Sequence, residues 1–289
     1  MSAKWRKIIL IAGIATCSIT SAADRVSLQR ADGKILPALV YAPSHACQGI
    51  AIISHGAGGS ELGYGYLARF MASQDYLTVV PGHQESGLGA LQKSGTGQGN
   101  RDALMNLVAN KSAYTARLMD ISAARQWAAP RCNGKAAILL GHSMGAATVM
   151  MVAGAENYMG IDDNQRKVLQ LDSVFDRYVA LSPQGKGVIF PHHAWSGIQR
   201  PVLMMTGTKD DSLGGGSWKK RTEAFADMPV GCKWLGVIDG ATHMNFAGYD
   251  LSSQNAANIT QTMTAFLRAT PEKSCQAPAP TIGLSLSAK

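Results

Sequence analysis

The sequence predicts an α/β domain in which a mostly parallel sheet of about eight strands is covered by helices on both faces. Short apolar runs alternate with longer segments typical of helices, the order expected of a parallel sheet. Runs such as Ala136–Gly141 are continuously apolar, as in strands buried on both faces. The 289 residues, 46% hydrophobic and 16% charged, suffice for one large domain and exclude wholesale disorder.

Eight strands are predicted in chain order, the first two as an opening pair: Val26–Gln29, Leu36–Tyr41, Ile50–Ser54, Leu77–Pro81, Ala136–Gly141, Tyr178–Ser182, Val202–Gly207 and Lys233–Asp239. Helices are predicted between and after them: Tyr66–Gln74, Ala113–Ala128, Met144–Ala155, Trp218–Ala226 and Asn255–Ala269. The glycine-rich stretch Gly82–Asn100 is predicted to be a mobile loop. The tail of residues 276–289, rich in Pro, Ala and Ser, is predicted to be disordered.

The N-terminus has the pattern of a secretory signal peptide. Basic residues (Lys4, Arg6 and Lys7) precede the apolar stretch Ile8–Ile19, and small residues follow before Asp24. We therefore expect residues 1–23 to be removed and the domain of residues 24–275 to be periplasmic or secreted. An N-terminal anchor is the alternative, but the apolar stretch is short for a span of about 20 residues.

Charge and hydropathy limit the kinds of partner that we expect. The formal net charge of +8 falls to +5 without residues 1–23. The one dense basic cluster, Lys219-Lys220-Arg221, is interpreted as a solvated helix face, and no basic stripe or module indicates a nucleic-acid partner. No apolar run of spanning length follows residue 23, so stable membrane insertion is not expected after signal cleavage.

The sharpest motif is Gly141-His142-Ser143-Met144-Gly145, between an apolar strand and a helix of small residues. This context is typical of a nucleophile elbow, in which a tight turn raises the Ser143 hydroxyl above the sheet edge. A serine hydroxyl needs a base, and in this architecture an acid and then a histidine follow it in the chain.

Three histidines follow Ser143. His243 comes directly after the strand Lys233–Asp239 and is the predicted base, whereas His192 and His193 are interpreted as surface residues. Asp210 and Asp211 both follow the strand Val202–Gly207, and either could orient the imidazole.

The oxyanion donors are predicted from backbone amides. One is the amide of Met144, the residue after the nucleophile. The other comes from the loop His55-Gly56-Ala57-Gly58-Gly59, with Ala57 as the favoured donor. A phosphate-binding loop is the rival interpretation, but the Lys-Ser/Thr ending of a P-loop is missing.

These residues resemble the α/β-hydrolase superfamily, in its dienelactone-hydrolase-like, platelet-activating-factor-acetylhydrolase and chlorophyllase-like branch. The resemblance rests on four stretches: Ile53–Gly59, Gly141–Gly145, Gly207–Asp210 and Gly240–His243. It implies ester hydrolysis through an acyl-enzyme with no metal and no cofactor. Dienelactone hydrolases use a cysteine nucleophile where this chain has Ser143, so the branch does not name the substrate.

The resemblance also bears on the choice between the two aspartates and on the presence of a cap domain. In this fold the acid follows the strand-ending glycine by three residues, which favours Asp210 over Asp211. Lids of the fold are most often inserted after the sixth strand. Here fewer than 20 residues separate Ser182 from Pro201, so no cap domain is expected.

Four cysteines remain after signal cleavage, and in an oxidising compartment they predict two disulfides with three possible pairings. No two lie within four residues of each other, so no cysteine metal site is expected. The strand order implied by the resemblance favours Cys47–Cys132 and Cys232–Cys275.

The leading function is therefore an exported carboxylic ester hydrolase with the triad Ser143, His243 and Asp210, acting on a small-molecule or polymeric ester. Gly56, His142 and Trp195 are the expected substrate-binding residues. A peptidase or amidase of the same fold is the alternative within this chemistry. A catalytically inactive binding protein is the alternative of a different class.

Overall fold

The computed structural model describes residues 23–94, 100–134, 136–172, 174–269 and 275–289. The predicted signal peptide lies outside the described residues except for Ala23, so its cleavage stays a prediction. Among the described residues, no helix is both long and apolar enough to cross a membrane.

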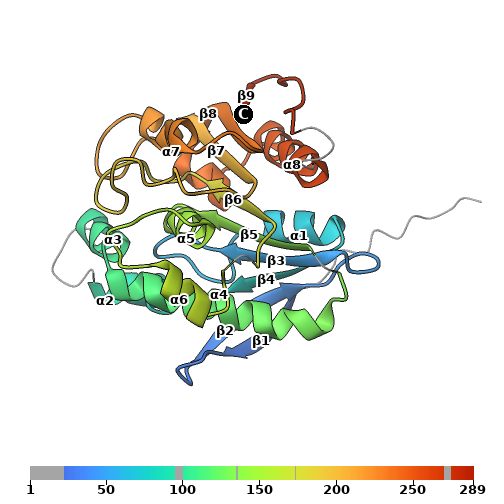
Figure 1. Ribbon diagram of the computed structural model, residues 1–289, viewed down its shortest axis with the longest axis vertical. Coiled ribbons are helices and arrows are strands. Elements are labelled where there is room, and N and C mark those ends of the chain that lie inside the picture. The colour runs from blue at the N-terminus through green and yellow to red at the C-terminus, as the bar shows by residue number, and fades with distance from the viewer. Residues whose placement is uncertain (1–22, 95–99, 135, 173, 270–274) are drawn as a thin grey trace, which may run out of the picture.

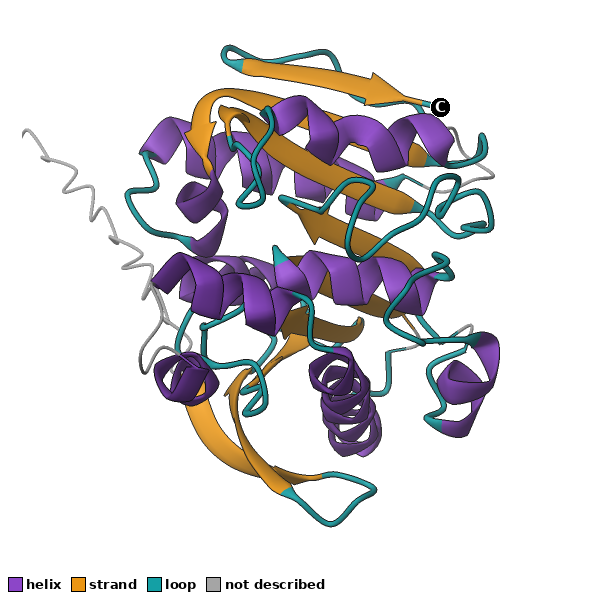
Figure 2. Cartoon of the chain, turned by 90° about the vertical axis from the view of Figure 1, so that its left-hand side faces the viewer, coloured by secondary structure: helices purple, strands orange, loops and turns teal. Residues whose placement is uncertain are grey.

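The described chain forms one sheet of nine strands in the order β1-β2-β4-β3-β5-β6-β7-β8-β9. Strands β3 to β8 run parallel, whereas β2 pairs antiparallel with β4, β1 antiparallel with β2, and β9 antiparallel with β8. Their bounds are β1 Ala23–Gln29, β2 Ile35–Tyr41, β3 Gly49–Ser54, β4 Tyr76–Pro81, β5 Ala136–His142, β6 Arg177–Leu181, β7 Val202–Lys209, β8 Lys233–Thr242 and β9 Leu284–Ala288. Figure 2 shows the strands stacked from the β1–β2 hairpin at one edge to β9 at the other.

Helices cover both faces of the sheet (Figure 1), because alternate residues of each central strand are buried on opposite sides. Ile52 of β3 belongs to the buried cluster that includes helix residues of Lys111–Ala128 and Met144–Ala153, and Ile53 belongs to the cluster on the other face, with residues of Gly65–Ser73 and Ser253–Arg268. The α-helices are α1 Gly65–Ser73, α2 Leu88–Ser94, α3 Asn100–Val108, α4 Lys111–Ala128, α5 Met144–Ala153, α6 Asp163–Val168, α7 Glu223–Asp227 and α8 Ser253–Arg268. Short 3-10 helices are η1 Ala129–Arg131, η2 Trp218–Thr222 and η3 His243–Ala247.

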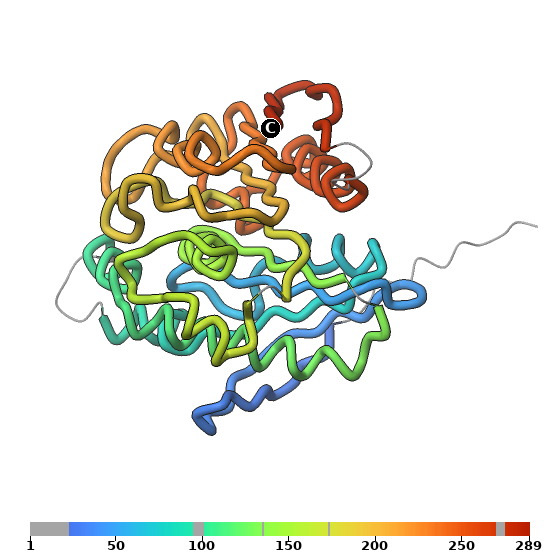
Figure 3. The backbone as a smooth tube through the Cα atoms, in the orientation of Figure 1, coloured from blue at the N-terminus to red at the C-terminus, as the bar shows by residue number. Residues whose placement is uncertain are grey.

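The prediction of a disordered tail over residues 276–289 is wrong for its last part. Residues Leu284–Ala288 form β9, which pairs antiparallel with β8. Figure 3 shows the chain ending there, at the edge farthest from the N-terminal hairpin. Without β9, strand β8 would present unpaired backbone groups at the sheet edge, so the tail covers that edge.

The prediction of a loop over Gly82–Asn100 is also incomplete. Within it α2 begins at Leu88, and α3 follows from Asn100, with residues 95–99 outside the described chain. Ala103 and Leu107 of α3 are buried at i, i+4 spacing, which fixes one face of this helix against the domain.

Both predicted disulfides are present. Cys47 and Cys132 precede the parallel neighbours β3 and β5, and their Cα atoms lie 5.5 Å apart. Cys232 precedes β8 and is joined to Cys275, with a Cα separation of 5.0 Å. The indole of Trp234 also donates to the Cys275 carbonyl at 2.8 Å, so Cys275 is held beside β8.

Candidate active site

Ser143 lies in a strained turn between β5 and α5. Its backbone has φ 55° and ψ −121°, a region that residues other than glycine rarely adopt. A side chain on Gly145 would collide with the Ser54 carbonyl, and one on Gly141 would collide with the carbonyl of Gly145. The two glycines of the motif are therefore required by close backbone approach, as a nucleophile elbow demands.

The predicted base and acid lie side by side. Strands β7 and β8 pair Lys209 with Thr242, so Asp210 and His243 are the next residues at the carboxyl edge of both strands. His243 Nδ1 donates to Asp210 Oδ1 at 2.8 Å, which leaves Nε2 for proton transfer. Asp210 is buried, and its second oxygen accepts from Thr206 Oγ1 at 2.9 Å.

The interpretation of Lys219-Lys220-Arg221 as a solvated face is wrong for Arg221. Its guanidinium is buried and lies 2.8 Å from Asp210 Oδ1, and it also donates to the carbonyls of Asp210 and Ser182. A buried carboxylate needs such a charge partner. Asp211 is exposed and accepts from the Trp218 amide at 3.0 Å, the turn role expected for the aspartate that does not contact His243.

The structure also links the three loops around Ser143 through Tyr64, a residue that the sequence did not single out. The Gly56 amide donates to the Tyr64 hydroxyl at 3.1 Å, and that hydroxyl lies 2.7 Å from His142 Nδ1. His142 Nε2 lies 3.0 Å from the His243 carbonyl oxygen, which can only accept. His142 Nδ1 therefore accepts from Tyr64, and a series of hydrogen bonds joins the loop of residues 55–59, the turn at Ser143 and the backbone of His243.

These hydrogen bonds give His142 a structural role in addition to the predicted one. Both ring nitrogens are bonded within the protein, so His142 has no ring nitrogen to offer a substrate. Gly56 borders the pocket, but its amide is likewise occupied by Tyr64. Both residues connect the loops around Ser143 and also line the pocket, so their role in substrate binding stays a prediction.

Ser143 and His243 open into one pocket of about 720 Å³. Besides the elbow, most of its lining comes from residues 56–64, α2 and α3, residues 184–189, the loop of residues 211–215, and residues 243–249. The prediction that Trp195 lines the site is wrong, because its side chain is 0% exposed and packs on Phe190 at a ring distance of 5.1 Å.

The mouth of the pocket is apolar. Ten large hydrophobic side chains are exposed in the described residues, and five of them line this pocket: Leu62, Leu88, Val188, Met244 and Tyr249. Exposed apolar side chains gathered around one opening are typical of a surface that binds apolar groups.

Three histidines at and beneath the site are buried in neutral form. Burial lowers the pKa of His55 to about 3 and holds the pKa values of His83 and His142 well below their ordinary value. Burial also raises the pKa of Asp120 to about 7. The unfolded chain therefore binds more protons than the folded chain at the histidines below pH 6.5, and fewer at Asp120 between about pH 4 and 7.

This difference in bound protons predicts that acid destabilises the folded protein. Between pH 6 and 5 the unfolded chain binds about three more protons at these histidines than the folded chain does. The folded chain binds one more proton at Asp120, which offsets one of the three. Because each proton corresponds to about 1.4 kcal/mol per pH unit, the remaining two lower the free energy of unfolding by up to about 3 kcal/mol per pH unit. Urea denaturation at pH 7, 6 and 5 measures it, and a free energy that stays level or rises between pH 6 and 5 contradicts the neutral burial.

Comparison with known proteins supports the fold. A scan against protein-family models and a search of curated proteins gave no match. The chain is similar to a protein described as a dienelactone hydrolase from Klebsiella pneumoniae subsp. pneumoniae, at 16% identity and a TM-score of 0.58, with 86% of this chain and 99% of that chain covered. An esterase from Pyrococcus furiosus matches at 14% identity and a TM-score of 0.57, covering 91% and 98%.

The esterase domain of a Rhodothermus marinus protein also matches, at 16% identity and a TM-score of 0.57, with 86% of this chain and 98% of that chain covered. These likenesses extend over nearly the whole length of each solved structure. Together with the strand order and the elbow after β5, they identify the architecture: the chain has the α/β-hydrolase fold.

Proposed function

We propose that the protein is a serine esterase that cleaves carboxylic esters through an acyl-enzyme. The observation that carries the proposal is the buried Asp210 hydrogen-bonded to His243 at 2.8 Å, in the same pocket as a serine held at φ 55°. A serine strained in this way, with a histidine and a carboxylate in register, suits nucleophilic attack on a carbonyl. The solved structures named as esterases support the same chemistry.

The proposed reaction has two halves. Ser143 Oγ attacks the ester carbonyl while His243 Nε2 takes its proton, and Asp210 stabilises the imidazolium. The oxygen of the tetrahedral intermediate accepts from the amides of Ala57 and Met144. The alcohol leaves with the proton from His243, and water then attacks the acyl-enzyme by the same route.

The pocket supports esters with an apolar portion, either small molecules or the ends of polymers. The apolar mouth can hold alkyl or aromatic groups on both sides of the ester. No cap domain follows β6, because Ile189, Phe190 and Ile198 bury the segment between β6 and β7 in the core.

We further propose that the protein is exported, with residues 1–23 as its signal peptide. Two disulfides suit an oxidising compartment such as the periplasm or the exterior of the cell.

The test is kinetics of the mature chain on p-nitrophenyl acetate and butyrate, with butyryl p-nitroanilide as the matched amide. We expect hyperbolic kinetics on both esters without a jump at the solubility limit, and turnover of the anilide lower by at least about 100-fold, since its amine is the poorer leaving group. Discrimination per methylene should stay within about 1–3 kcal/mol. Turnover of the anilide at the ester rate favours a peptidase. Activity confined to emulsified triglycerides contradicts a pocket without a cap domain.

A further inference from the structure

Helix α4 buries a full positive charge beneath the active site. The Arg117 side chain is 0% exposed, and every hydrogen bond that it makes goes to an uncharged oxygen. Nη1 donates to the carbonyl of His55 at 2.6 Å and to Ser54 Oγ at 3.1 Å, and Nη2 donates to the carbonyl of Gly56 at 3.3 Å. A buried charge without a direct counter-ion is costly, so it needs a role beyond packing.

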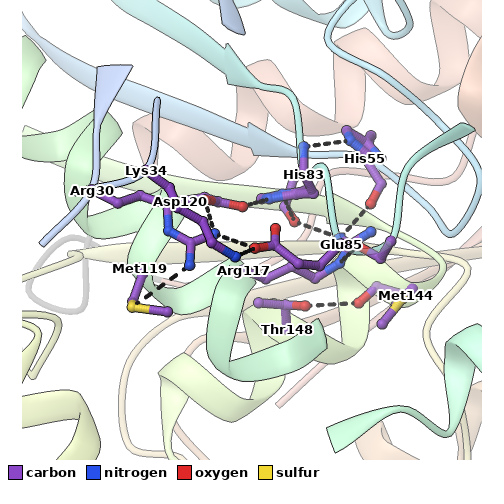
Figure 4. A network of polar contacts seen from close by, with 12 residues as sticks. Arg30, Lys34, His55, His83, Glu85, Arg117, Met119, Asp120, Met144 and Thr148 are labelled. Carbon is purple, nitrogen blue, oxygen red and sulfur yellow. Dashed lines mark hydrogen bonds and ion pairs between the residues drawn. The ribbon is translucent and has the colours of Figure 1, made fainter. Parts of the chain in front are cut away.

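Figure 4 shows the hydrogen bonds around this guanidinium, and their donors and acceptors indicate where the two histidine rings carry their protons. The His83 amide donates to His55 Nε2 at 3.0 Å, so the His55 ring carries its proton on Nδ1 and donates it to the Gly56 carbonyl at 2.7 Å. His83 Nδ1 faces Asp120 Oδ2 at 2.8 Å and donates to it, so His83 Nε2 accepts from the Ser54 hydroxyl at 2.9 Å. Arg117 is thus connected to Asp120 through two neutral side chains, those of Ser54 and His83.

This network acts on a single peptide group. The Gly56 carbonyl accepts from Arg117, from His55 and from the Gly59 amide at 3.2 Å. The chain has no cis peptide bond in its described part, so the Ala57 amide, on the same peptide, points the opposite way from that carbonyl. With the carbonyl held inward, the Ala57 N–H faces the pocket.

The other amides of the loop are already used. The amide of Gly56 donates to Tyr64, that of Gly58 donates to the Ser86 carbonyl at 2.8 Å, and that of Gly59 donates to Gly56. In the described residues, the Ala57 amide alone among residues 56–59 has no acceptor. The loop also adjoins the nucleophile, since a methyl group on Gly56 would lie 3.3 Å from Cβ of Ser143.

We propose that Arg117 is a positioning residue of the oxyanion hole: with His55 it holds the Gly56 carbonyl inside the protein and thereby aims the Ala57 amide at the oxygen that becomes negative when Ser143 adds to an ester. The inference rests on the proposed esterase function. Because this amide matters most when charge develops on the oxygen, its misalignment reduces transition-state stabilisation and has little effect on substrate binding.

The test compares Arg117→Met with a second buried arginine. Methionine has a similar length and no donors, and we expect kcat on p-nitrophenyl butyrate to fall about 100-fold, the lower end for losing an oxyanion donor, with KM within about threefold. Arg117→Lys keeps the charge but loses the planar fork and should fall in between. Arg166→Met is the control, because Arg166 is also buried but pairs with Asp163, donates to the Met151 carbonyl and makes no hydrogen bond to the loop, so its kcat should stay within about twofold.

Two further measurements separate positioning from folding. Active sites are titrated with a fluorophosphonate so that kcat is counted per reactive Ser143, and the affinity for phenylboronic acid, which forms an anionic tetrahedral adduct, should fall in parallel with kcat. His55→Leu removes a donor to Gly56 without stranding a charge, and it should lower kcat about tenfold at unchanged KM if Arg117→Met does not fold.

The inference is overturned if folded Arg117→Met or His55→Leu keeps a per-site kcat within threefold of the wild type, or if the loss lies in KM. Absence of both ester turnover and fluorophosphonate labelling in the wild type would instead reject the proposed function, so the two failures are distinguishable.

Discussion

Replacing Ser143 by alanine should lower kcat on p-nitrophenyl butyrate by about 10⁵-fold or more, and His243→Ala should lower it by a similar factor. The elbow places one hydroxyl in the pocket, and the imidazole held by Asp210 is the base that the geometry offers it. Because nucleophile and base act in one proton transfer, the double variant should lose little more than either single variant. Residual turnover above that of water should persist through the oxyanion donors.

His193→Ala provides the matched control for the base. His193 also follows Ser143 in the chain, but it is 86% exposed and lies 3.1 Å from Asp227 Oδ1. Its removal should leave kcat unchanged. A fluorophosphonate should label the wild type and His193→Ala and fail to label Ser143→Ala. If purified Ser143→Ala keeps more than a tenth of wild-type turnover, another residue is the nucleophile.

The central strands could be predicted because burial on both faces leaves a local record. Ile50–Ile53 and Ala136–Gly141 are continuously apolar in sequence, and both are fully or almost fully buried within β3 and β5. The elbow left an equally local record, because the close approach of α5 to β5 and to Ser54 demands glycine at 141 and 145. These signals need no knowledge of distant contacts.

The missed features depend on residues far apart in the chain. Tyr64 meets His142 across 78 positions, and Arg117 meets His55 across 62 positions, so no spacing or motif could pair them. Arg221 was misread because a run of basic residues usually faces solvent, yet its partner Asp210 lies on another segment. Strand β9 was missed because its alternating Leu-Ser pattern is short, and its pairing with β8 is a tertiary contact.

Asp210→Asn should lower kcat by about 10⁴-fold while Asp211→Asn stays near the wild-type rate. The carboxylate of Asp210 accepts the Nδ1 proton of His243 at 2.8 Å, which fixes the tautomer whose Nε2 can receive the proton of Ser143. An asparagine amide in its place can donate to Nδ1 and favour the wrong tautomer, and it cannot stabilise the imidazolium. Asp211 is the matched control because it is adjacent in sequence. Within the described residues, the one hydrogen bond that its carboxylate accepts comes from the Trp218 amide.

Stability must be measured alongside the rate, because Arg221 lies 2.8 Å from the same oxygen. Asp210→Asn strands this buried guanidinium, and we expect the free energy of unfolding to fall by about 3–5 kcal/mol. Thermal melts identify a temperature at which Asp210→Asn is folded, and kcat is measured there. We expect the rate loss at that temperature to remain, because the folded variant lacks the carboxylate. Since the variant still carries Ser143, a fluorophosphonate should label it, but slowly. If Asp211→Asn abolishes turnover while folded Asp210→Asn remains near the wild-type rate, Asp211 is the acid and the contact between Asp210 and His243 is structural.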